Sequence, residues 1–337
     1  MGRSRDGERD PVAAASEDEV DLYDVATWEE RTSLDGLSVA LYRLLVGSAR
    51  ALILLFAFGL LVGIGGFSAI TDPRIGVLTA LSAVPALALA GYVWHSDVTE
   101  GEPLTLLFAT FLLGILTANF AAVLNGFAQG AFQELGFLGS VLFFFLVVGP
   151  VEETVKLLAV RLYAYTDTRF RAVVDGAVYG AMAGLGFAFI ENALYITRNL
   201  SAANMDAGLG LIGMGSGIVG IRALAGPGHV IYSAFAGYYL GLAKFNPGNR
   251  GPIVIKGLLI AAVIHALYNS TVGIGSALIG FVTGLPPILA FLVYIVVYDG
   301  VFGLLLFRKI RRYNAVYRDV HDEGEPVPEP DPAEFEA

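Results

Sequence analysis

Four polar motifs interrupt otherwise apolar stretches of this chain, and their residue types are those of acid–base and metal chemistry. The motifs are EETVK at 152–156, FAFIEN at 187–192, GPGHVIYSAFAGYYLG at 226–241 and HALYN at 265–269. An ionisable side chain in a lipid-spanning segment costs about 2.5 kcal/mol or more, so such residues usually face the protein interior and serve a function. The candidate catalytic residues in these motifs are Glu152, Glu153, Glu191, His229, His265 and Asn269.

The first motif places two carboxylates and one ammonium group on the same side of a helix. Glu152 and Lys156 are four residues apart, and Glu153 and Lys156 are three apart, so both pairs are in reach of each other. One lysine neutralises one carboxylate, and the other must be held by a further group or take up a proton. Adjacent carboxylates in different protonation states suit general acid–base catalysis. From this motif alone, a structural salt bridge beside one protonated glutamate explains the residues equally well.

The other three motifs lie on helix faces made of small residues. Small residues at four-residue spacing mark faces where transmembrane helices pack closely. At about 1.5 Å per residue, the polar residues come out about 20 to 30 Å from the cytoplasmic boundary. We therefore expect four helices to bring their polar residues together in the outer half of the membrane. The small residues are Gly180 and Gly184 before Glu191, Ser233, Gly237 and Gly241 after His229, and Gly257 and Ala261 before His265 and Asn269.

Hydrolysis of a peptide bond by water is the simplest reaction for this set of groups. A carboxylate can activate water, an imidazole can bind a metal or donate to an oxyanion, and the Asn269 amide suits an oxyanion. His229, His265 and Glu191 also make a plausible three-ligand zinc site, with a metal-free glutamate mechanism as the alternative. The sequence contains no Ser-His-Asp, Cys-His, HExxH or P-loop pattern. Two other functions stay open, namely a proton-coupled transporter with a Glu/His relay and a non-catalytic membrane scaffold.

The elements that must position these residues are membrane-spanning helices. Hydrophobic residues make up 55% of the 337-residue chain and charged residues 15%, and the mean hydropathy is +0.66. Lipid offers no partners for backbone polar groups, so each long apolar run must be helical. The lack of cysteine excludes disulfides and thiolate metal sites. We predict an all-α membrane protein with about eight transmembrane helices, near 51–70, 76–94, 104–124, 137–165, 172–197, 227–245, 253–274 and 286–307.

Basic loops predict how these helices are oriented. Lys and Arg concentrate in cytoplasmic loops, and three basic segments fall on that side if there are eight spans and both tails are cytoplasmic. The glycine-rich segment 208–226 is therefore predicted to be re-entrant or interfacial rather than a ninth span. We expect a multi-pass protein of the cell membrane. The basic segments contain Arg169 and Arg171, Lys244 and Arg250, and residues 308–312.

The net charge of −10 comes from the two ends of the chain. We expect an acidic, largely disordered cytoplasmic segment at 1–45, a multi-pass protease domain at 46–310, and a basic juxtamembrane stretch followed by an acidic disordered tail at 311–337. The acidity does not indicate a nucleic-acid partner, and the lipid bilayer is the expected surrounding. Asp175 and Lys256 are expected to be structural residues held in buried ion pairs, whereas Asp299 has no assigned partner.

The ordered motifs resemble those of the PrsW family of intramembrane proteases, within the superfamily of CAAX prenyl proteases and bacteriocin-processing enzymes. The resemblance covers roughly residues 45–310 and rests on EExxK, FxxxE followed by Asn, an intramembrane histidine and HxxxN. The prenyl-protease branch typically has FxxxH where this chain has Phe187 and Glu191, which argues against CAAX processing.

The resemblance implies an intramembrane endopeptidase that acts on membrane-anchored protein substrates. Its water would be activated by glutamate, by a metal bound to His and Glu, or by both. By position, Glu152 and Glu153 would activate the water, and Asn269 would assist the oxyanion. Glu191, His229 and His265 would complete the site, with Lys156, Phe187 and Asn192 in supporting positions.

Overall fold

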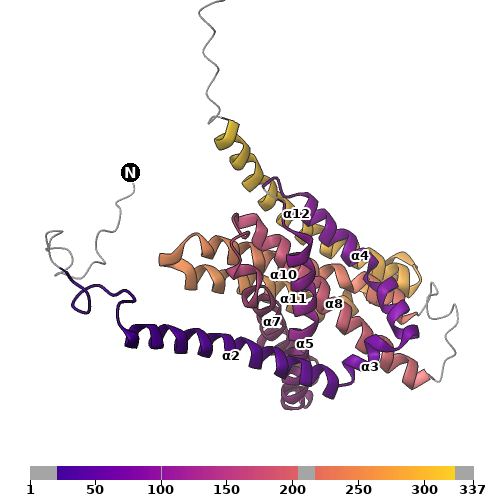
Figure 1. Ribbon diagram of the computed structural model, residues 1–337. Coiled ribbons are helices and arrows are strands. Elements are labelled where there is room, and N and C mark those ends of the chain that lie inside the picture. Colours follow the sequence, from indigo (N-terminus) through magenta and orange to yellow (C-terminus); the bar gives the residue numbers. More distant parts are fainter. Residues whose placement is uncertain (1–20, 100, 204–216, 323–337) are drawn as a thin grey trace, which may run out of the picture. The chain divides into compact units, whose positions relative to one another are not determined.

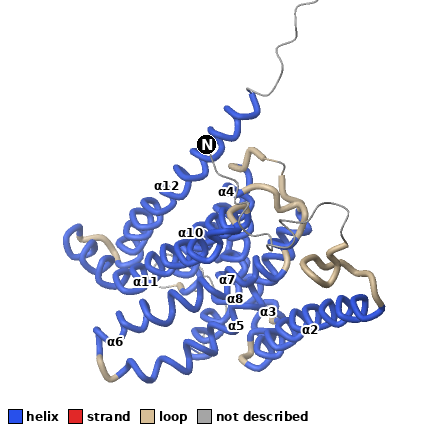
Figure 2. The backbone as a smooth tube through the Cα atoms, turned by 90° about the vertical axis from the view of Figure 1, so that its left-hand side faces the viewer, coloured by secondary structure: helices blue, strands red, loops and turns tan. Residues whose placement is uncertain are grey.

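The computed structural model describes residues 21–99, 101–203 and 217–322, and within them it is built of helices (Figures 1 and 2). The described residues contain no β-strand, and their one isolated bridge joins Tyr23 and Thr27. This confirms the predicted all-α class. The chain divides into a unit at 1–56 and a unit at 57–337, and each is described separately below.

The first unit is ordered earlier in the chain than we predicted. Helix α2 (Ser33–Gly63) begins within the segment 1–45 that we expected to be largely disordered. Thr32 and Asp35 form a reciprocal cap, because each side chain accepts the backbone N–H of the other residue, at 2.7 and 3.2 Å. The Asp35 carboxylate also accepts hydrogen bonds from the Tyr23 hydroxyl and, at 3.2 Å, from Trp28 Nε1. This polar cluster starts the helix ahead of the apolar run.

The second unit contains a helical stretch for each remaining predicted span, although several ends differ. The expected single span at 137–165 consists of two helices joined by a π-helical turn at Phe144–Val148. The helices are α3 (Gly66–Thr71), α4 (Pro73–His95), α5 (Leu104–Gln133), α6 (Gly136–Phe143), α7 (Gly149–Leu162), α8 (Val173–Ala203), α10 (Ile218–Lys244), α11 (Arg250–Thr283) and α12 (Pro287–Asp322).

Six of the described helices are long and apolar enough to cross a membrane, namely α2, α4, α5, α8, α11 and α12. The protein is therefore a multi-pass membrane protein. Helix α7 and helix α10, which carry much of the polar cluster, are not among the six. The segment 208–226 was predicted to be separate from the following span, but its described part from Ile218 onward is the first part of α10, which runs through Pro227. Residues 208–216 lie outside the described residues.

The predicted small-residue faces meet between α8 and α10, which lie close together near the middle of the second unit (Figure 1). A Cβ atom on Gly180 would lie 2.2 Å from the Ser233 carbonyl oxygen, and one on Gly237 would lie 2.0 Å from the Gly176 carbonyl oxygen. Real Cβ atoms do not approach this closely, so glycine is required at these positions. The two backbones touch along this seam, which brings the polar residues of both helices to one place.

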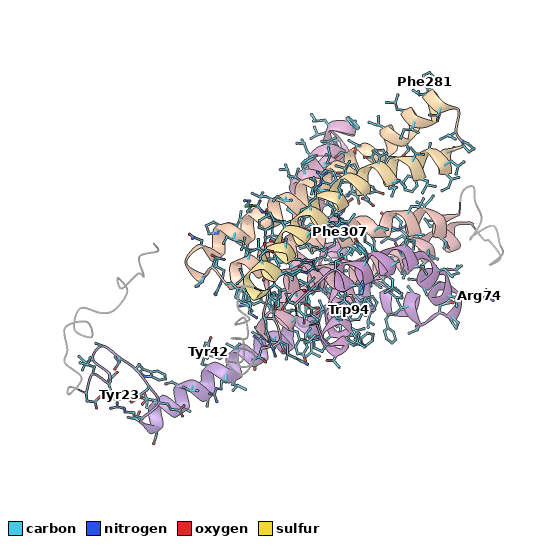
Figure 3. The ribbon with its side chains drawn as sticks, turned by 90° about the horizontal axis from the view of Figure 1, so that it is seen from above. Tyr23, Tyr42, Arg74, Trp94, Phe281 and Phe307 are labelled. Atoms are coloured by element: carbon cyan, nitrogen blue, oxygen red, sulfur yellow. The ribbon has the colours of Figure 1, made fainter. Side chains whose placement is uncertain are left out.

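Away from this core, large apolar side chains point outward. Phe281 lies at the end of α11 and projects away from the neighbouring helices (Figure 3). Phe281, Phe127 and Val282 are each more than two-thirds exposed. In water such a surface would promote association, whereas lipid tails cover it at no comparable cost.

Within the described part of the chain, neither Asp175 nor Lys256 forms the buried ion pair that we predicted. Asp175 accepts the backbone N–H groups of Arg171 at 2.6 Å and Ala172 at 3.0 Å, at the start of α8. Lys256 is exposed, with its ammonium 5.5 Å from the centre of the Tyr239 ring. The expectation failed because Asp175 lies at a helix start, where free backbone donors satisfy one carboxylate oxygen.

Candidate active site

The beginning of α7 positions the two adjacent glutamates against α11. The π-helical turn at Phe144–Val148 leads into Gly149 and Pro150, the first residues of α7. A Cβ atom on Gly149 would lie 2.5 Å from the Ala262 carbonyl oxygen of α11, so this approach requires glycine. Glu152 and Glu153, one turn later, are thereby placed beside His265, one turn after Ala262.

Glu153 is completely buried, and its carboxylate is surrounded by donors. Its Oε1 atom lies 2.6 Å from Lys156 Nζ and 2.9 Å from His265 Nδ1. Its Oε2 atom accepts a longer bond of 3.4 Å from the Ser233 hydroxyl. A carboxylate bound to Nδ1 fixes the ring orientation and leaves Nε2 of His265 available for a ligand or reactant. Glu153 is therefore placed to hold His265.

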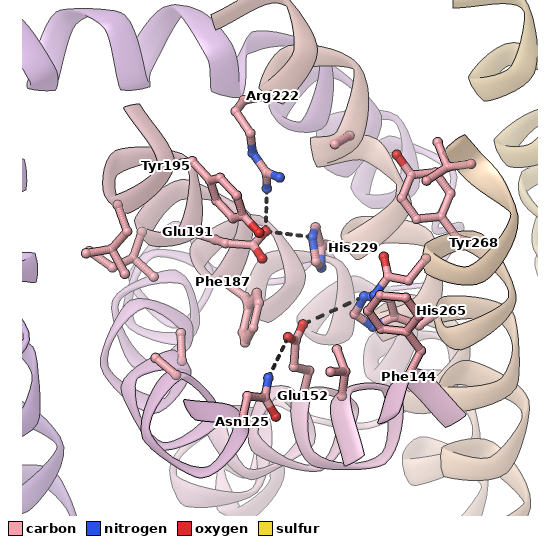
Figure 4. A pocket seen from close by; sticks show the side chains of 18 of the residues that line it. Asn125, Phe144, Glu152, Phe187, Glu191, Tyr195, Arg222, His229, His265 and Tyr268 are labelled. Atoms are coloured by element: carbon pink, nitrogen blue, oxygen red, sulfur yellow. Dashed lines mark hydrogen bonds and ion pairs between the residues drawn. The ribbon is translucent and has the colours of Figure 1, made fainter. Parts of the chain in front are cut away.

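Glu152 differs from its neighbour because one of its oxygens has no donor. Asn125 Nδ2 of α5 donates to Glu152 Oε1 at 3.0 Å. Glu152 Oε2 is buried and has no hydrogen-bond partner among the described residues. His265 Nε2 lies 3.7 Å from it and Lys156 Nζ 3.9 Å. Figure 4 shows Glu152 between Asn125 and His265. This oxygen is the one glutamate atom of the pair that is free to act on a reactant.

On the other side of the site, His229 links Lys156 to Glu191. Its Nδ1 atom lies 2.9 Å from Lys156 Nζ, and its Nε2 atom lies 3.0 Å from Glu191 Oε2. The Lys156 ammonium also lies 4.2 Å from the centre of the Phe187 ring. The ring therefore provides a cation–π contact for this buried charge, which gives Phe187 a physical role.

Arg222 completes this side of the site, and the sequence analysis did not select it. The guanidinium is ion-paired with Glu191 (Figure 4), and its Nε donates to Asn192 Oδ1 at 2.8 Å. Asn192 in turn donates to the Ser82 hydroxyl of α4 at 2.9 Å. Arg222 lies seven residues before His229, so both occupy one face of α10. That spacing was the available signal, but we had assigned residue 222 to a separate segment.

These side chains line a cavity of about 580 Å³ between α5, α7, α8, α10 and α11. The predicted oxyanion donor, Asn269, lines it one turn after His265, and Asn125 lines it from α5. Asn125 was also missed, because the predicted span ended at residue 124. Five of the six predicted catalytic residues border the cavity, and the sixth, Glu153, lies directly behind His265.

The arrangement of possible metal ligands differs from the predicted one. One ligand atom each from Glu152, His229 and His265 lies within 4.8 Å of the others. We had predicted Glu191 in place of Glu152. The Glu191 carboxylate is engaged by Arg222, whereas Glu152 keeps a buried oxygen without a partner. Two imidazoles and a carboxylate form a donor set typical of catalytic zinc, and these residues fit such an ion if His229 Nδ1 exchanges its contact with Lys156 Nζ for the metal.

Fold and site together define a class: a multi-pass helical membrane protein with buried glutamates and histidines around an internal cavity, suited to intramembrane hydrolysis. Sequence comparison identifies the family. The PrsW family intramembrane metalloproteases match residues 102–301, and the chain belongs to this family.

Several relatives carry the name Protease PrsW. The protein from Halalkalibacterium halodurans is 32% identical over 196 residues, which cover 58% of this chain and 82% of that protein. The protein from Shouchella clausii is 30% identical, over 57% of this chain and 81% of the relative. The protein from Bacillus subtilis is 28% identical over 68% of this chain and 94% of the relative. No solved structure matches this chain. The family supports an intramembrane protease and gives no support to the transporter alternative.

Proposed function

We propose that this intramembrane protease cleaves membrane-anchored proteins in the cavity between α5 and α11, with Glu152 as the residue that activates water. The observation that carries the proposal is the buried Glu152 Oε2 atom, which has no partner among the described residues and faces His265 Nε2 at 3.7 Å. A base must have a free oxygen at the cavity surface, and Glu153 and Glu191 are occupied by cations.

The surrounding residues prepare Glu152 for this role. Asn125 orients the carboxylate by binding its other oxygen. Having taken a proton from water, the same carboxyl group can return it to the leaving amine. Lys156 supplies positive charge on one side, 3.9 Å from Glu152 Oε2, and the Asn269 amide lines the cavity as a donor for the oxyanion. Glu153 holds His265 in place.

A divalent metal such as zinc would be held by Glu152, His229 and His265. When bound, such an ion lowers the pKa of its water and polarises the peptide carbonyl. Glu152 is then a ligand rather than a free base, and it is essential in both forms of the site. Glu191 and Arg222 would keep His229 oriented through its Nε2 atom.

The substrate class follows from where the site lies. Three of the helices that line the cavity, α5, α8 and α11, are long and apolar enough to span a membrane, so a substrate would reach the cavity from the membrane and expose an extended, unwound segment to the catalytic groups. We also propose that both tails lie in the cytoplasm, as the basic loops favour, and that 46–310 forms the protease domain.

The proposal is tested with a single-span reporter that the wild-type protein cleaves. Glu152→Gln and His265→Ala should each abolish cleavage, with expression and membrane insertion unchanged. Glu134→Gln, an exposed glutamate between α5 and α6, serves as the matched control and should cleave normally. Full cleavage by both active-site variants would refute the assignment.

Metal analysis of the same purified proteins separates the two forms of the site. The metal form would be established by two results together. The wild-type protein would contain about one zinc per chain and Glu152→Gln none, and a chelator would abolish cleavage by the wild-type protein. Cleavage that persists in metal-depleted protein would establish glutamate alone.

A further inference from the structure

A second cluster of acids lies away from the cavity, where the α4–α5 loop meets the start of α8. It consists of Asp97 and Glu102 in the loop and Asp175 in the first turn of α8, and one oxygen from each lies within 4.8 Å of the others. Glu191 follows Asp175 by sixteen residues, which is about 24 Å along the helix. The cluster is therefore separate from the proteolytic site.

Each acid of this cluster has at least one buried oxygen without a hydrogen bond among the described residues. Glu102 is only 4% exposed, and neither of its carboxylate oxygens has a partner. Asp97 accepts from the Thr99 hydroxyl and backbone N–H with Oδ1, at 2.8 Å each, which leaves Oδ2 free. Asp175 uses Oδ2 for the backbone of α8 and leaves Oδ1 free. Four buried oxygens thus remain for one ligand.

A buried group next to the cluster also lacks a partner. The Tyr179 side chain is fully buried, and its hydroxyl has no hydrogen-bond partner in the described part of the chain. Tyr179 follows Asp175 by one helical turn, and its hydroxyl is under the electrostatic influence of Glu102 and Asp175. A buried hydroxyl without a partner is costly, so an additional bound atom near it is expected.

Three carboxylates this close together repel one another unless protons or a cation compensate their charge. Burial, with the charges of Asp97 and Asp175, raises the pKa of Glu102 to about 9. Lys244 is the neighbouring lysine, but its ammonium group donates to the backbone carbonyls of Tyr165 and Phe170, at 2.9 Å each, rather than to the three carboxylates.

We propose that Asp97, Glu102 and Asp175 bind a hard divalent cation of the calcium and magnesium class, which fastens the α4–α5 loop to the start of α8. All the donors are oxygens, which calcium and magnesium prefer, and the absence of an imidazole distinguishes this site from the Glu/His/His site. The cation would anchor the helix that carries Phe187, Glu191 and Asn192.

The test measures thermal unfolding and calcium binding of the full-length protein in detergent, after stripping with EDTA and removal of the chelator. Calcium or magnesium at millimolar concentration should raise the Tm of the wild-type protein by about 5 °C. Glu102→Gln should remove this rise and weaken calcium binding in equilibrium dialysis at least tenfold. Without divalent cations, Glu102→Gln should be at least as stable as wild type, because the substitution removes a buried carboxyl group that the charges of Asp97 and Asp175 repel.

Two controls keep this result separate from folding defects and from the proteolytic site. Glu134→Gln and Glu152→Gln should both retain the Tm rise, since neither residue belongs to the cluster. A calcium-induced rise of equal size in wild type and Glu102→Gln would overturn the proposal. So would a wild-type protein that binds neither cation, which would mean that the cluster is compensated by protons.

Discussion

Among the described residues, two largely buried clusters of three carboxylates are compensated in different ways. In the active site, Glu153 and Glu191 are bound by Lys156 and Arg222, so one free carboxylate oxygen remains beside His265. In the α4–α5 loop cluster, four oxygens remain free. Protein-supplied cations leave a single buried oxygen without a partner among the described residues of the first group, whereas the second group is arranged to receive a cation from outside. The number of free oxygens distinguishes a catalytic cluster from a binding cluster.

Removing the lysine should make the active-site cluster resemble the loop cluster, and we expect the largest effect from this change. Lys156→Met leaves Glu153 buried without its ammonium partner, which should lower the free energy of unfolding by about 3 to 5 kcal/mol. Chemical denaturation in detergent would measure this loss. The double variant Lys156→Met/Glu153→Leu should recover most of it. If the single variant were as stable as wild type, the charge balance described above would be wrong.

The seam between α8 and α10 holds the active-site cluster together and should tolerate no added atoms. Gly180→Ala would place a Cβ atom 2.2 Å from the Ser233 carbonyl oxygen, and we expect a loss of about 1 to 3 kcal/mol. Gly126→Ala on α5 is the control, because no atom lies within 4 Å of its added Cβ. Equal stability of both variants would contradict the observed backbone contact.

Arg222 is the second cation of the active site, and weakening its contacts should affect activity more than folding. Arg222→Lys keeps the positive charge but cannot bind Glu191 and Asn192 together in the guanidinium geometry. We expect cleavage to slow about tenfold, because the orientation of His229 depends on Glu191. Rates on the tethered reporter, with Arg198→Lys as a cavity-lining control, would measure this. An unchanged rate would show that Arg222 has no positioning role.

The smallest effect concerns an acid outside the membrane that is already satisfied. Hydrogen bonds from the Arg169 side chain and backbone lower the pKa of Asp167 to about 2. A lowered carboxyl pKa contributes stability above its unfolded value of about 3.9, and this contribution is lost as the pH falls toward 2. Asp167→Asn should therefore lower the Tm at pH 7 by about 1 °C or less, and the difference should vanish near pH 2. A difference that grew as the pH fell would contradict this sign.

Much of the active site was predictable because helical spacing and small-residue faces are local properties of the sequence. Gly180, Gly184 and Gly237 predicted closely packed helix faces, and in the structure these faces form the α8–α10 seam that brings Glu191 to His229. The difference in bonding between Glu152 and Glu153 was not predictable, because it depends on Asn125 and Ser233 from other helices. The sequence places these donors 27 and 80 residues away from their partners.

Two boundary errors have identifiable causes. The helix start at Ser33 was missed although Thr32 and Asp35 form a recognisable capping pair, because the hydropathy of the segment was given more weight. Arg222 was assigned to a re-entrant segment because the basic loops favoured eight spans, but the residues from Ile218 onward form the first part of α10. A charge seven residues from an intramembrane histidine was the better signal.

The most direct test of the central claim compares two glutamates of the same cavity under single-turnover conditions. Purified Glu152→Gln and Glu191→Gln proteins in liposomes would be assayed on the same single-span reporter. Because Glu152 carries the free oxygen, Glu152→Gln should slow cleavage about 10³-fold or more, and Glu191→Gln only about 10- to 100-fold. A Glu152→Gln protein that cleaves faster than Glu191→Gln would contradict the assignment of Glu152 as the reactive carboxylate.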